Sequence, residues 1–233
     1  MLKTLRLAVI GDGRMGQAVV ALAPERGFEV VAVAGAAQAA PAGITRTLLN
    51  GADVAVEFTV PRSAATNVRG CVAAGCPVVS GTTGWDDERP AVEEAVRAAG
   101  GALLWAPNFS IGVHLFARIA ADAARRVGAV DAGFDLHLVD THHAAKRDAP
   151  SGTARLIAAL VAERSGRALP ITSVRTGSVP GTHEVIFDAP FEQIRLVHVA
   201  RDRRVFAAGA LTAARWLVDK HGVFTFDHLL GTA

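Results

Sequence analysis

The first hundred residues alternate between short apolar runs and longer segments whose apolar positions have helical spacing. The apolar runs predict five strands, over Leu5–Ile10, Phe28–Ala34, Asp53–Thr59, Pro77–Ser80 and Ala102–Ala106. The segments between them predict helices over Arg14–Arg26, Arg62–Ala74 and Asp86–Ala99. Near-continuous apolar strands separated by helices indicate a parallel sheet that is covered on both faces. Because such crossovers are right-handed, we expect an α/β fold with a doubly wound parallel sheet.

The pattern changes after Pro107. It predicts helices over Ser110–Val127, Thr153–Ser165 and Val205–Lys220, and strands over Phe134–Asp140, Ser173–Thr176, Glu184–Asp188 and Ile194–Ala200. Helices packed on a run of sequential strands indicate a smaller α+β domain, and we expect its sheet to be antiparallel. We therefore predict a first domain over 1–107 and a second over 108–206. The C-terminal helix and tail, 207–233, are expected to return to the first domain.

Composition excludes several classes of protein. The 233 residues are 51% hydrophobic with only 10 prolines, which excludes a disordered chain. The net charge of +2 comes without a Lys/Arg-rich block, so we expect no nucleic-acid partner. No signal peptide precedes the first strand, no run of 18 apolar residues occurs, and the two cysteines need not pair. We expect a cytoplasmic protein without a membrane partner.

A glycine-rich turn joins the first predicted strand to the first helix, with the sequence Gly11-Asp12-Gly13-Arg14-Met15-Gly16. In this motif Gly11 permits the tight turn, Gly13 lets a pyrophosphate approach the backbone, and Gly16 lets the helix pack closely on the strand. The N–H groups and dipole of the helix N-terminus then favour phosphate. The motif predicts a dinucleotide site; the alternative is a simple strand-to-helix turn.

The sequence leaves the choice of dinucleotide open. An acid at the end of the second strand would bind the ribose of NAD, but Ala34-Gly35-Ala36-Ala37 provides neither an acid nor an arginine there. No carboxylate repels a 2′-phosphate, and Arg14 could reach one. NADH and NADPH therefore both remain possible.

Two further turns follow predicted strands at the edge where open α/β sheets bind ligands. Gly81-Thr82-Thr83-Gly84 follows the fourth strand, and Ala106-Pro107-Asn108-Phe109-Ser110 follows the fifth. They offer backbone amides, hydroxyls and a side-chain amide near a nicotinamide. Without the glycine-rich turn upstream, both would be interpreted as ordinary loops.

The segment from Asp140 to Thr153 carries the densest candidate chemistry. It holds two adjacent histidines, one of the chain's three lysines, and a Ser-Gly-Thr sequence that opens a helix. Adjacent histidines point in different directions and no cysteine lies nearby, so we expect no metal. Cationic donors beside a helix N-terminus suit a small substrate with carboxylates. The alternative is a polar surface loop with a capped helix.

The string His142-His143-x-x-Lys146-x-Asp148-x-Pro150-Ser151-Gly152-Thr153 resembles the signature of the dihydrodipicolinate reductase (4-hydroxy-tetrahydrodipicolinate reductase) family of bacterial lysine biosynthesis. Further segments resemble motifs of that family in the family's order: Gly13-Arg14-Met15-Gly16, Glu57-Phe58-Thr59, Gly81-Thr82-Thr83-Gly84 and Asn108-Phe109-Ser110-Ile111-Gly112. The similarity covers essentially the whole chain.

The resemblance implies a Rossmann domain, a second domain for substrate binding and tetramerisation, and reduction of 4-hydroxy-tetrahydrodipicolinate to tetrahydrodipicolinate by NADPH or NADH. It implies that His142 is the proton donor and that Lys146 is a second donor that also binds the dicarboxylate substrate. The remaining substrate-binding residues would be His143, Ser151, Gly152 and Thr153. The cofactor-binding residues would be Gly11, Asp12, Gly13, Arg14, Met15, Gly16, Gly81, Thr82, Thr83, Ala106, Pro107, Asn108 and Phe109. The assembly would be a homotetramer.

The chain departs from the family pattern in a few places. Its first glycine turn is one residue shorter than the commonest form, and Asp140 stands where Glu is frequent. We expect Arg175 and His183 mainly to order loops and hydrogen bonds between strands. Two other functions are alternatives to the reductase that the resemblance implies. A related Rossmann dehydrogenase would share the glycine turn but not the histidine-lysine string, and a nucleotide-sensing regulator would not need His142 and Lys146.

Overall fold

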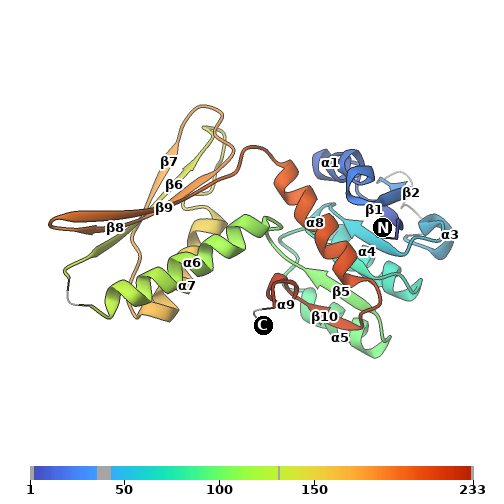
Figure 1. Cartoon of the computed structure of the whole chain (residues 1–233). Helices are drawn as coiled ribbons and strands as arrows, with labels where there is room; N and C mark the ends of the chain where they lie inside the picture. The colour runs from blue at the N-terminus through green and yellow to red at the C-terminus, as the bar shows by residue number, and fades with distance from the viewer. Residues whose placement is uncertain (1–2, 36–42, 131, 232–233) are drawn as a thin grey trace. The chain divides into compact units, whose positions relative to one another are not determined.

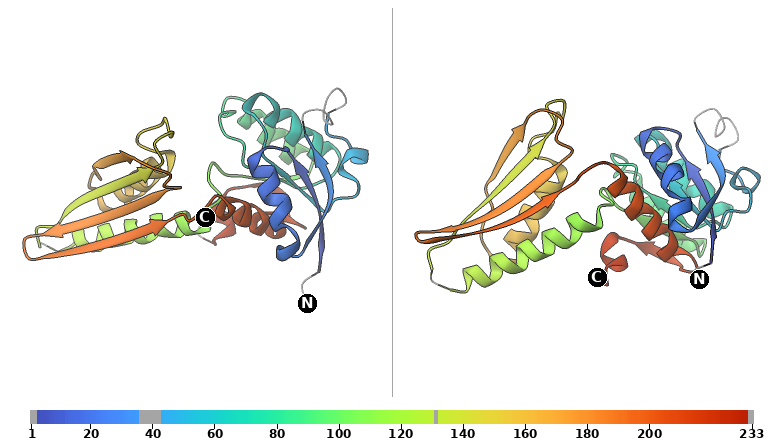
Figure 2. Two further views of the ribbon diagram at one scale, coloured as in Figure 1. Left: turned by 90° about the horizontal axis from the view of Figure 1, so that it is seen from above. Right: turned by 45° about the horizontal axis from the view of Figure 1, so that its top comes forward.

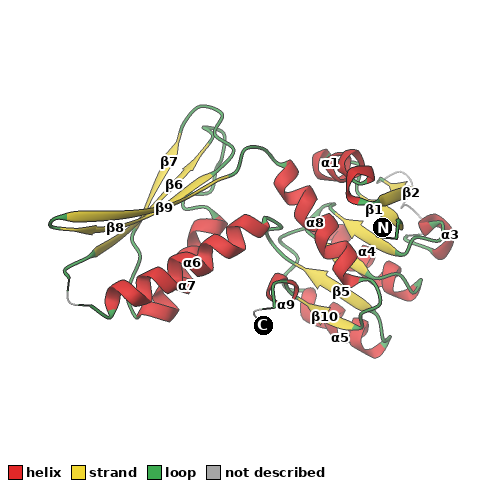
Figure 3. Cartoon of the chain, viewed as in Figure 1, coloured by secondary structure: helices red, strands yellow, loops and turns green. Residues whose placement is uncertain are grey.

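The structure is a computed structural model that describes residues 3–35, 43–130 and 132–231. The chain forms two compact units. Unit 1 comprises Met1–Phe109 and Arg204–Ala233, and unit 2 comprises Ser110–Arg203. Figure 3 shows that both units combine helices with a sheet. Among the described residues, no helix is long and apolar enough to cross a membrane.

Unit 1 is built on a six-stranded parallel sheet with the strand order β10-β5-β4-β3-β1-β2 (Figure 1). The strands are β1 (Leu5–Ile10), β2 (Phe28–Ala34), β3 (Val54–Glu57), β4 (Val78–Ser80), β5 (Ala102–Trp105) and β10 (Gly222–Phe224). The strand order reverses beside β1, whose neighbours are β2 and β3. This arrangement confirms the predicted doubly wound, Rossmann-type class.

Helices cover both faces of this sheet. Contacts join α1 (Arg14–Leu22) to α8 (Arg204–Leu217) on one face, and α4 (Pro61–Ala73) to α5 (Arg89–Ala98) on the other (Figure 1). The described residues of the unit also form three short helices, η1 (Pro24–Arg26), α3 (Arg46–Leu49) and α9 (Phe226–Leu229). The first helix ends earlier than predicted, because Pro24 lacks the N–H group that continues an α-helix.

The C-terminal segment is part of unit 1 through a close helix contact. A Cβ atom at Gly209 of α8 would lie 1.7 Å from the carbonyl oxygen of Phe109, so only glycine allows this approach. The ring of Phe109 meets Phe58 and Phe226 edge to face at 5.8 and 5.6 Å. The strand β10, which adds the sixth position to the sheet, was not predicted because three residues give no periodic signal.

Unit 2 contains a four-stranded sheet with the order β7-β6-β8-β9. Its strands are β6 (Asp135–His142), β7 (Ile171–Arg175), β8 (Thr182–Ala189) and β9 (Glu192–Val199). The expectation of an antiparallel sheet is wrong for one pair, since β6 and β7 run parallel while the β6–β8 and β8–β9 pairs are antiparallel. The reason is α7 (Gly152–Ser165), a crossover helix that returns the chain to the start of β6.

Two helices pack on one face of the sheet of unit 2 (Figure 2). They are α6 (Ile111–Gly128), whose N-cap Ser110 accepts a hydrogen bond from the Val113 N–H at 3.2 Å, and α7. Leu136 and Leu138 of β6 point into the core beneath these helices. Because side chains alternate along a strand, Asp140 and His142 point to the same face at the end of β6.

Candidate active site

The glycine turn of unit 1 has the geometry that a pyrophosphate site requires. Gly11 has φ +113°, a conformation that favours glycine. A Cβ atom at Gly16 would lie 1.8 Å from the carbonyl oxygen of Gly11, so α1 packs closely on the turn. A Cβ atom at Gly13 would meet no atom within 4 Å, so this part of the backbone is open to a ligand. The turn therefore fits a dinucleotide.

Two cavities flank this turn. One, of about 490 Å³, extends to the end of β2 and is lined by residues that include Asp12, Ala34, Gly35, Arg62, Thr66 and Asn67. The other, of about 370 Å³, extends to the end of β4 and is lined by residues that include Arg14, Met15, Thr59, Gly81, Thr82 and Thr83. Gly13 lines both. In a doubly wound sheet the adenosine half of a dinucleotide lies toward the second strand. The second cavity is therefore on the side of the nicotinamide.

Some of the predicted cofactor-binding residues line the two cavities and others do not. Residues 106–109 line neither cavity. Ala106 and Phe109 are buried in the core, and Phe109 is in contact with other aromatic rings. Arg14 lines the cavity at β4, whereas Arg62 lines the cavity at the end of β2. The sequence predicts neither an acid nor an arginine for the cofactor ribose at the end of the second strand, and Ala36 and Ala37 of that segment lie outside the described residues.

In unit 2 a buried carboxylate organises the end of β6. Asp140 is 0% exposed. Its Oδ2 atom accepts hydrogen bonds from the Ser151 backbone N–H at 2.9 Å and from Nη2 of Arg175 at 2.9 Å. Its Oδ1 atom accepts a hydrogen bond from the Ser151 hydroxyl at 2.8 Å. The same hydroxyl caps α7 by accepting a hydrogen bond from the Ala154 N–H at 3.1 Å, so Asp140 fixes where this helix begins.

These donors keep Asp140 ionised. Burial opposes its charge, but the hydrogen bonds from Ser151 and Arg175 outweigh that effect and lower the pKa of Asp140 to about 2. Arg175 also donates to the Asp140 carbonyl oxygen at 2.9 Å and to the Asp148 carbonyl oxygen at 2.6 Å. One guanidinium thus joins β7, β6 and the loop that follows β6.

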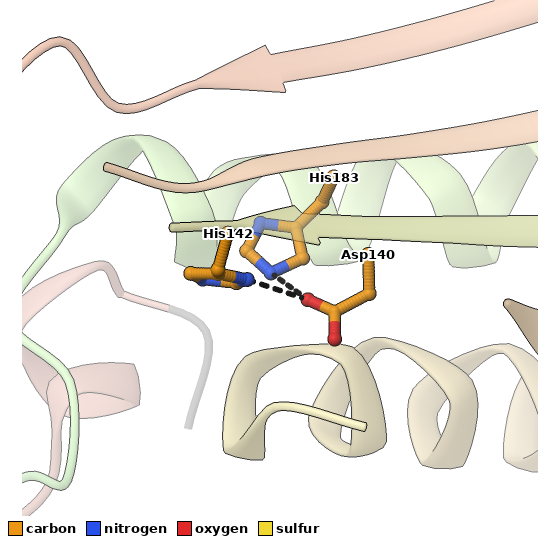
Figure 4. Close-up of side chains that lie close together, drawn as sticks. All are labelled: Asp140, His142 and His183. Carbon is orange, nitrogen blue, oxygen red and sulfur yellow. Dashed lines mark ion pairs between the residues drawn. The ribbon is translucent and has the colours of Figure 1, made fainter. Parts of the chain in front are cut away.

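His142 lies against this carboxylate, as Figure 4 shows. Its Nδ1 atom is 3.0 Å from Oδ1 of Asp140 but outside hydrogen-bond geometry. Burial lowers the pKa of His142, the charge of Asp140 opposes that effect, and the charges of Lys146 and Arg175 add to it. A Cβ atom at position 181 would lie 3.0 Å from Nε2 of His142, so Gly181 leaves room for the ring. His142 retains 11% of its side-chain surface exposed.

His183 lies beside His142 but has a different environment. Its Nε2 atom is 3.3 Å from the Ser151 hydroxyl oxygen and 3.3 Å from Oδ1 of Asp140. Because the proton of Ser151 is donated to Asp140, Nε2 of His183 must carry the hydrogen of this bond. Burial lowers the pKa of His183 to about 4, so the ring is neutral at pH 7. Its contacts join β8 to the start of α7.

Asp140, His142 and His183 have ligand atoms that lie within 4.8 Å of one another, close enough to surround a metal ion. The Asp140 carboxylate is already occupied by Ser151 and Arg175. The guanidinium charge beside it opposes a second cation. The expectation that the site uses no metal stays a prediction.

The other predicted substrate residues lie in the segment after β6 and at the start of α7. Nζ of Lys146 is 2.6 Å from Oδ1 of Asp148, and this hydrogen bond lowers the pKa of Asp148. Lys146 and Asp148 keep 24% and 44% of their side-chain surfaces exposed. Gly152 and Thr153 form the first turn of α7, and a Cβ atom at Gly152 would meet no atom within 4 Å. His143 is half-buried.

The sequence of the chain matches two models of known protein families. Residues 5–109 match the model described as "Dihydrodipicolinate reductase, N-terminus", and residues 112–230 match "Dihydrodipicolinate reductase, C-terminus". The chain belongs to the dihydrodipicolinate reductase family. The resemblance inferred from the sequence motifs is thereby confirmed. This family uses a nicotinamide cofactor and acts on a small-molecule substrate.

Curated relatives match along nearly the whole chain. A protein of Stenotrophomonas maltophilia named 4-hydroxy-tetrahydrodipicolinate reductase is 41% identical, with 91% of this chain and 92% of that protein covered. A protein of the same name from Natronomonas pharaonis is 38% identical, with 96% and 99% covered. The solved structure of dipicolinate-bound dihydrodipicolinate reductase from Paenisporosarcina sp. TG-14 has a TM-score of 0.79 at 24% identity, with 95% of this chain and 97% of that chain covered, which shows a common fold.

Sequence reasoning did not find the organising role of Asp140. It treated this residue only as a substitution for Glu and expected Arg175 to order loops. Two features of the sequence could have indicated this role. An acid lies two residues before the paired histidines, and the Ser-Gly-Thr sequence that follows starts a helix whose first N–H groups need acceptors. That Arg175 reaches the same carboxylate depends on the parallel pairing of β6 with β7.

The ionisation of Asp140 makes a testable contribution to stability. Its pKa is about 2 in the folded chain and about 3.9 in an unfolded one, so the carboxylate contributes about 2–3 kcal/mol to the free energy of unfolding above pH ~5. This contribution is lost as the pH falls through the folded-state pKa. We expect Asp140→Asn to be less stable than the wild type at pH 7 and to lose less stability between pH ~5 and ~2 in urea unfolding.

The matched control is Asp122→Asn, because Asp122 is an exposed acid on α6 that pairs with Arg125 and Arg126. The hydrogen bonds from Arg126 and Arg125 lower the pKa of Asp122, but solvent screens this pair, so its removal should change the acid branch of the unfolding curve much less than Asp140→Asn does. Parallel pH curves for the wild type and Asp140→Asn would contradict the assigned role of Asp140.

Proposed function

We propose that the chain reduces 4-hydroxy-tetrahydrodipicolinate to tetrahydrodipicolinate with NADPH or NADH, as a step of lysine (diaminopimelate) biosynthesis in the cytoplasm. The observation that carries this proposal is the position of the histidine-lysine segment, which follows β6 and is anchored by the buried carboxylate of Asp140. The family models, and the name of the relatives, support the same reaction. We assign cofactor binding to unit 1 and substrate binding, protonation and assembly to unit 2.

In unit 1 a bound nicotinamide cofactor supplies a hydride. The open backbone at Gly13 and the N-terminus of α1 bind its pyrophosphate. Gly81, Thr82 and Thr83 line the cavity on the nicotinamide side. Residues 106–109 line neither cavity, so their predicted part in cofactor binding has weaker support.

Loss of the 4-hydroxyl group as water leaves a conjugated substrate ring that accepts the hydride, and His142 donates the proton that balances the negative charge left by hydride addition. Because its Nδ1 atom faces Asp140, Nε2 is the atom that delivers the proton. Burial and the neighbouring cations lower the pKa of His142, which makes its charged form a stronger acid. The negative charges of a dicarboxylate raise this pKa again, so His142 takes up its proton as substrate binds. The negative charge of Asp140, 3.0 Å from Nδ1, stabilises the charged form of the ring.

Lys146, His143 and the start of α7 bind the substrate carboxylates. The helix start presents the backbone N–H groups of its first turn beside Ser151, Gly152 and Thr153. The ammonium of Lys146 adds the charge that a dianion requires. Asp148 holds this ammonium at 2.6 Å, and a substrate carboxylate takes the place of Asp148 when it binds.

The reaction is tested by following loss of the reduced cofactor's absorbance while a coupled synthase supplies the substrate. We expect His142→Gln to lower kcat by about 10²–10⁴-fold with NADPH affinity unchanged, because the variant lacks the acid. Lys146→Ala should lower kcat and raise KM, because it removes a substrate contact as well. Near-normal kcat in His142→Gln would contradict the assignment of the acid. Cofactor binding without turnover by the wild type would favour the nucleotide-sensing regulator.

We propose that NADPH and NADH are both accepted, because no charged residue lies between Gly35 and Thr45 of the sequence. Arg62, which lines the cavity at the end of β2, is the better-placed partner for a 2′-phosphate than Arg14. We expect Arg62→Gln to lower kcat/KM for NADPH about tenfold and to leave NADH within about twofold. Arg69→Gln, at another arginine of α4, is the control. Equal losses for both cofactors in Arg62→Gln would contradict a phosphate contact.

The proposed assembly is a homotetramer in which the open face of the sheet of unit 2 binds a second copy of the chain. Val174, Val197 and Val199 lie on this face and are 36%, 53% and 57% exposed. We expect light scattering to give the mass of four copies for the wild type and a smaller mass for Val197→Asp. Ile119→Asp, at a 57% exposed apolar position on α6, should keep the wild-type mass. A monomeric wild type would refute the assembly.

A further inference from the structure

Glu57 is a buried acid of unit 1 that the proposed reaction does not use. It is the last residue of β3 and is 0% exposed. Among the described residues, no lysine, arginine or histidine pairs with it, and its partners are three hydroxyls and one backbone N–H. A carboxylate is costly to bury unless its oxygens accept hydrogen bonds. These four hydrogen bonds therefore compensate the burial of Glu57.

The hydrogen bonds of Glu57 join three segments. Its Oε2 atom accepts from the Ser80 hydroxyl of β4 at 2.6 Å. Its Oε1 atom accepts from the Thr82 hydroxyl at 2.8 Å, from the Thr59 backbone N–H at 3.1 Å, and from the Thr59 hydroxyl. The turns that follow β3 and β4 are thus fastened to one carboxylate.

These bonds also fix the direction of each threonine hydroxyl. The Thr82 oxygen accepts the Thr59 N–H at 2.8 Å, and the Thr59 oxygen accepts the side-chain amide of Asn67 at 3.2 Å. Each oxygen therefore keeps one proton of its own to donate, and Glu57 takes both. Neither hydroxyl has a proton left for a ligand, so toward a ligand each can act only as an acceptor.

The backbone around Thr82 is held from other sides as well. Its carbonyl oxygen accepts hydrogen bonds from the indole N–H groups of Trp85 at 2.8 Å and Trp105 at 3.1 Å. A Cβ atom at Gly81 would lie 2.0 Å from the ring of Phe58, which excludes any larger residue there. The turn after β4 is therefore rigid, and the orientation of its hydroxyl depends on Glu57.

Thr82 lines the cavity of about 370 Å³ at the end of β4, on the side of the glycine turn where the nicotinamide half belongs, and Thr59 lines both this cavity and the one at the end of β2. We propose that Glu57 is a positioning residue for that half of the cofactor. By taking the protons of Thr59 and Thr82, it presents their oxygens as acceptors for the hydroxyls of the nicotinamide ribose and the N–H groups of the carboxamide. This inference rests on the proposed use of a nicotinamide cofactor.

The test compares a whole cofactor with a fragment that lacks nicotinamide. Calorimetric titration of Glu57→Met with NADPH should show at least about tenfold weaker binding, because the acceptor for both hydroxyls is lost. Titration with 2′,5′-ADP, which has no nicotinamide half, should stay within about twofold of the wild type. Glu57→Gln should bind NADPH within about threefold of the wild type, since its carbonyl replaces Oε1 and its amide can donate to Ser80.

A control variant separates this role from general destabilisation. Val96→Ala opens a small space in the core beside α5, where Val96 is 1% exposed, and should leave both titrations unchanged. If Glu57→Met does not fold, Thr82→Val removes one of the two oriented hydroxyls and should weaken NADPH binding but not 2′,5′-ADP binding.

Wild-type NADPH affinity in Glu57→Met, or equal losses for NADPH and 2′,5′-ADP, would overturn the inference. A loss in Glu57→Gln as large as that in Glu57→Met would also overturn it, because charge rather than the acceptor would then be decisive. A wild-type protein that binds neither NADPH nor NADH would instead refute the proposed function.

Discussion

The candidate substrate site depends on the hydrogen bonds that a buried carboxylate must accept. Asp140 lies two residues before the end of β6, Ser151 caps α7 eleven residues after Asp140, and Arg175 ends β7 thirty-five residues after it. Because Asp140 is fully buried, its charge is tolerated only while these donors are in place. The loop that carries His143 and Lys146 is closed at both ends by the same carboxylate. The positions of the proposed substrate-binding residues are thus set by the fold of unit 2 as a whole rather than by local preference.

Glu57 plays the corresponding part in unit 1, with a different chemical result. Both acids are fully buried and lie at or near the end of a strand, Glu57 as the last residue of β3 and Asp140 two residues before the end of β6. Both hold together segments that are distant in sequence. Asp140 is compensated by a guanidinium. It lies against His142, whose pKa is lowered by burial; the charge of Asp140 opposes this effect, and the charge of Arg175 adds to it. The charge of a bound substrate can then decide whether that histidine is protonated. Glu57 is surrounded by hydroxyls, so its effect is to orient them rather than to tune a proton transfer.

The sequence was sufficient for features that depend on local pattern. The apolar run before Gly11 predicts β1, and Ser151-Gly152-Thr153 predicts the start of a helix. Both signals lie within a few neighbouring residues. The contacts of Arg175 and His183 with Asp140 arise from the pairing of β6 with β7 and β8, which a single sequence does not encode locally. The same limit explains why the parallel β6–β7 pair and the three-residue β10 were missed.

The ion pair between Lys146 and Asp148 explains how the proposed site for a dianion can contain an acid. The two side chains are partly exposed, and such a pair contributes little free energy, on the order of 0–1 kcal/mol. In the proposed binding mode, replacing Asp148 by a substrate carboxylate therefore costs little, while the pair keeps the flexible lysine near the end of β6 before substrate arrives. Asp140 is different because it is buried and bound by Arg175, and its loss would leave an uncompensated cation. A carboxylate at the surface of the site, Asp148, can thus be replaced by another carboxylate, whereas the buried carboxylate of Asp140 cannot.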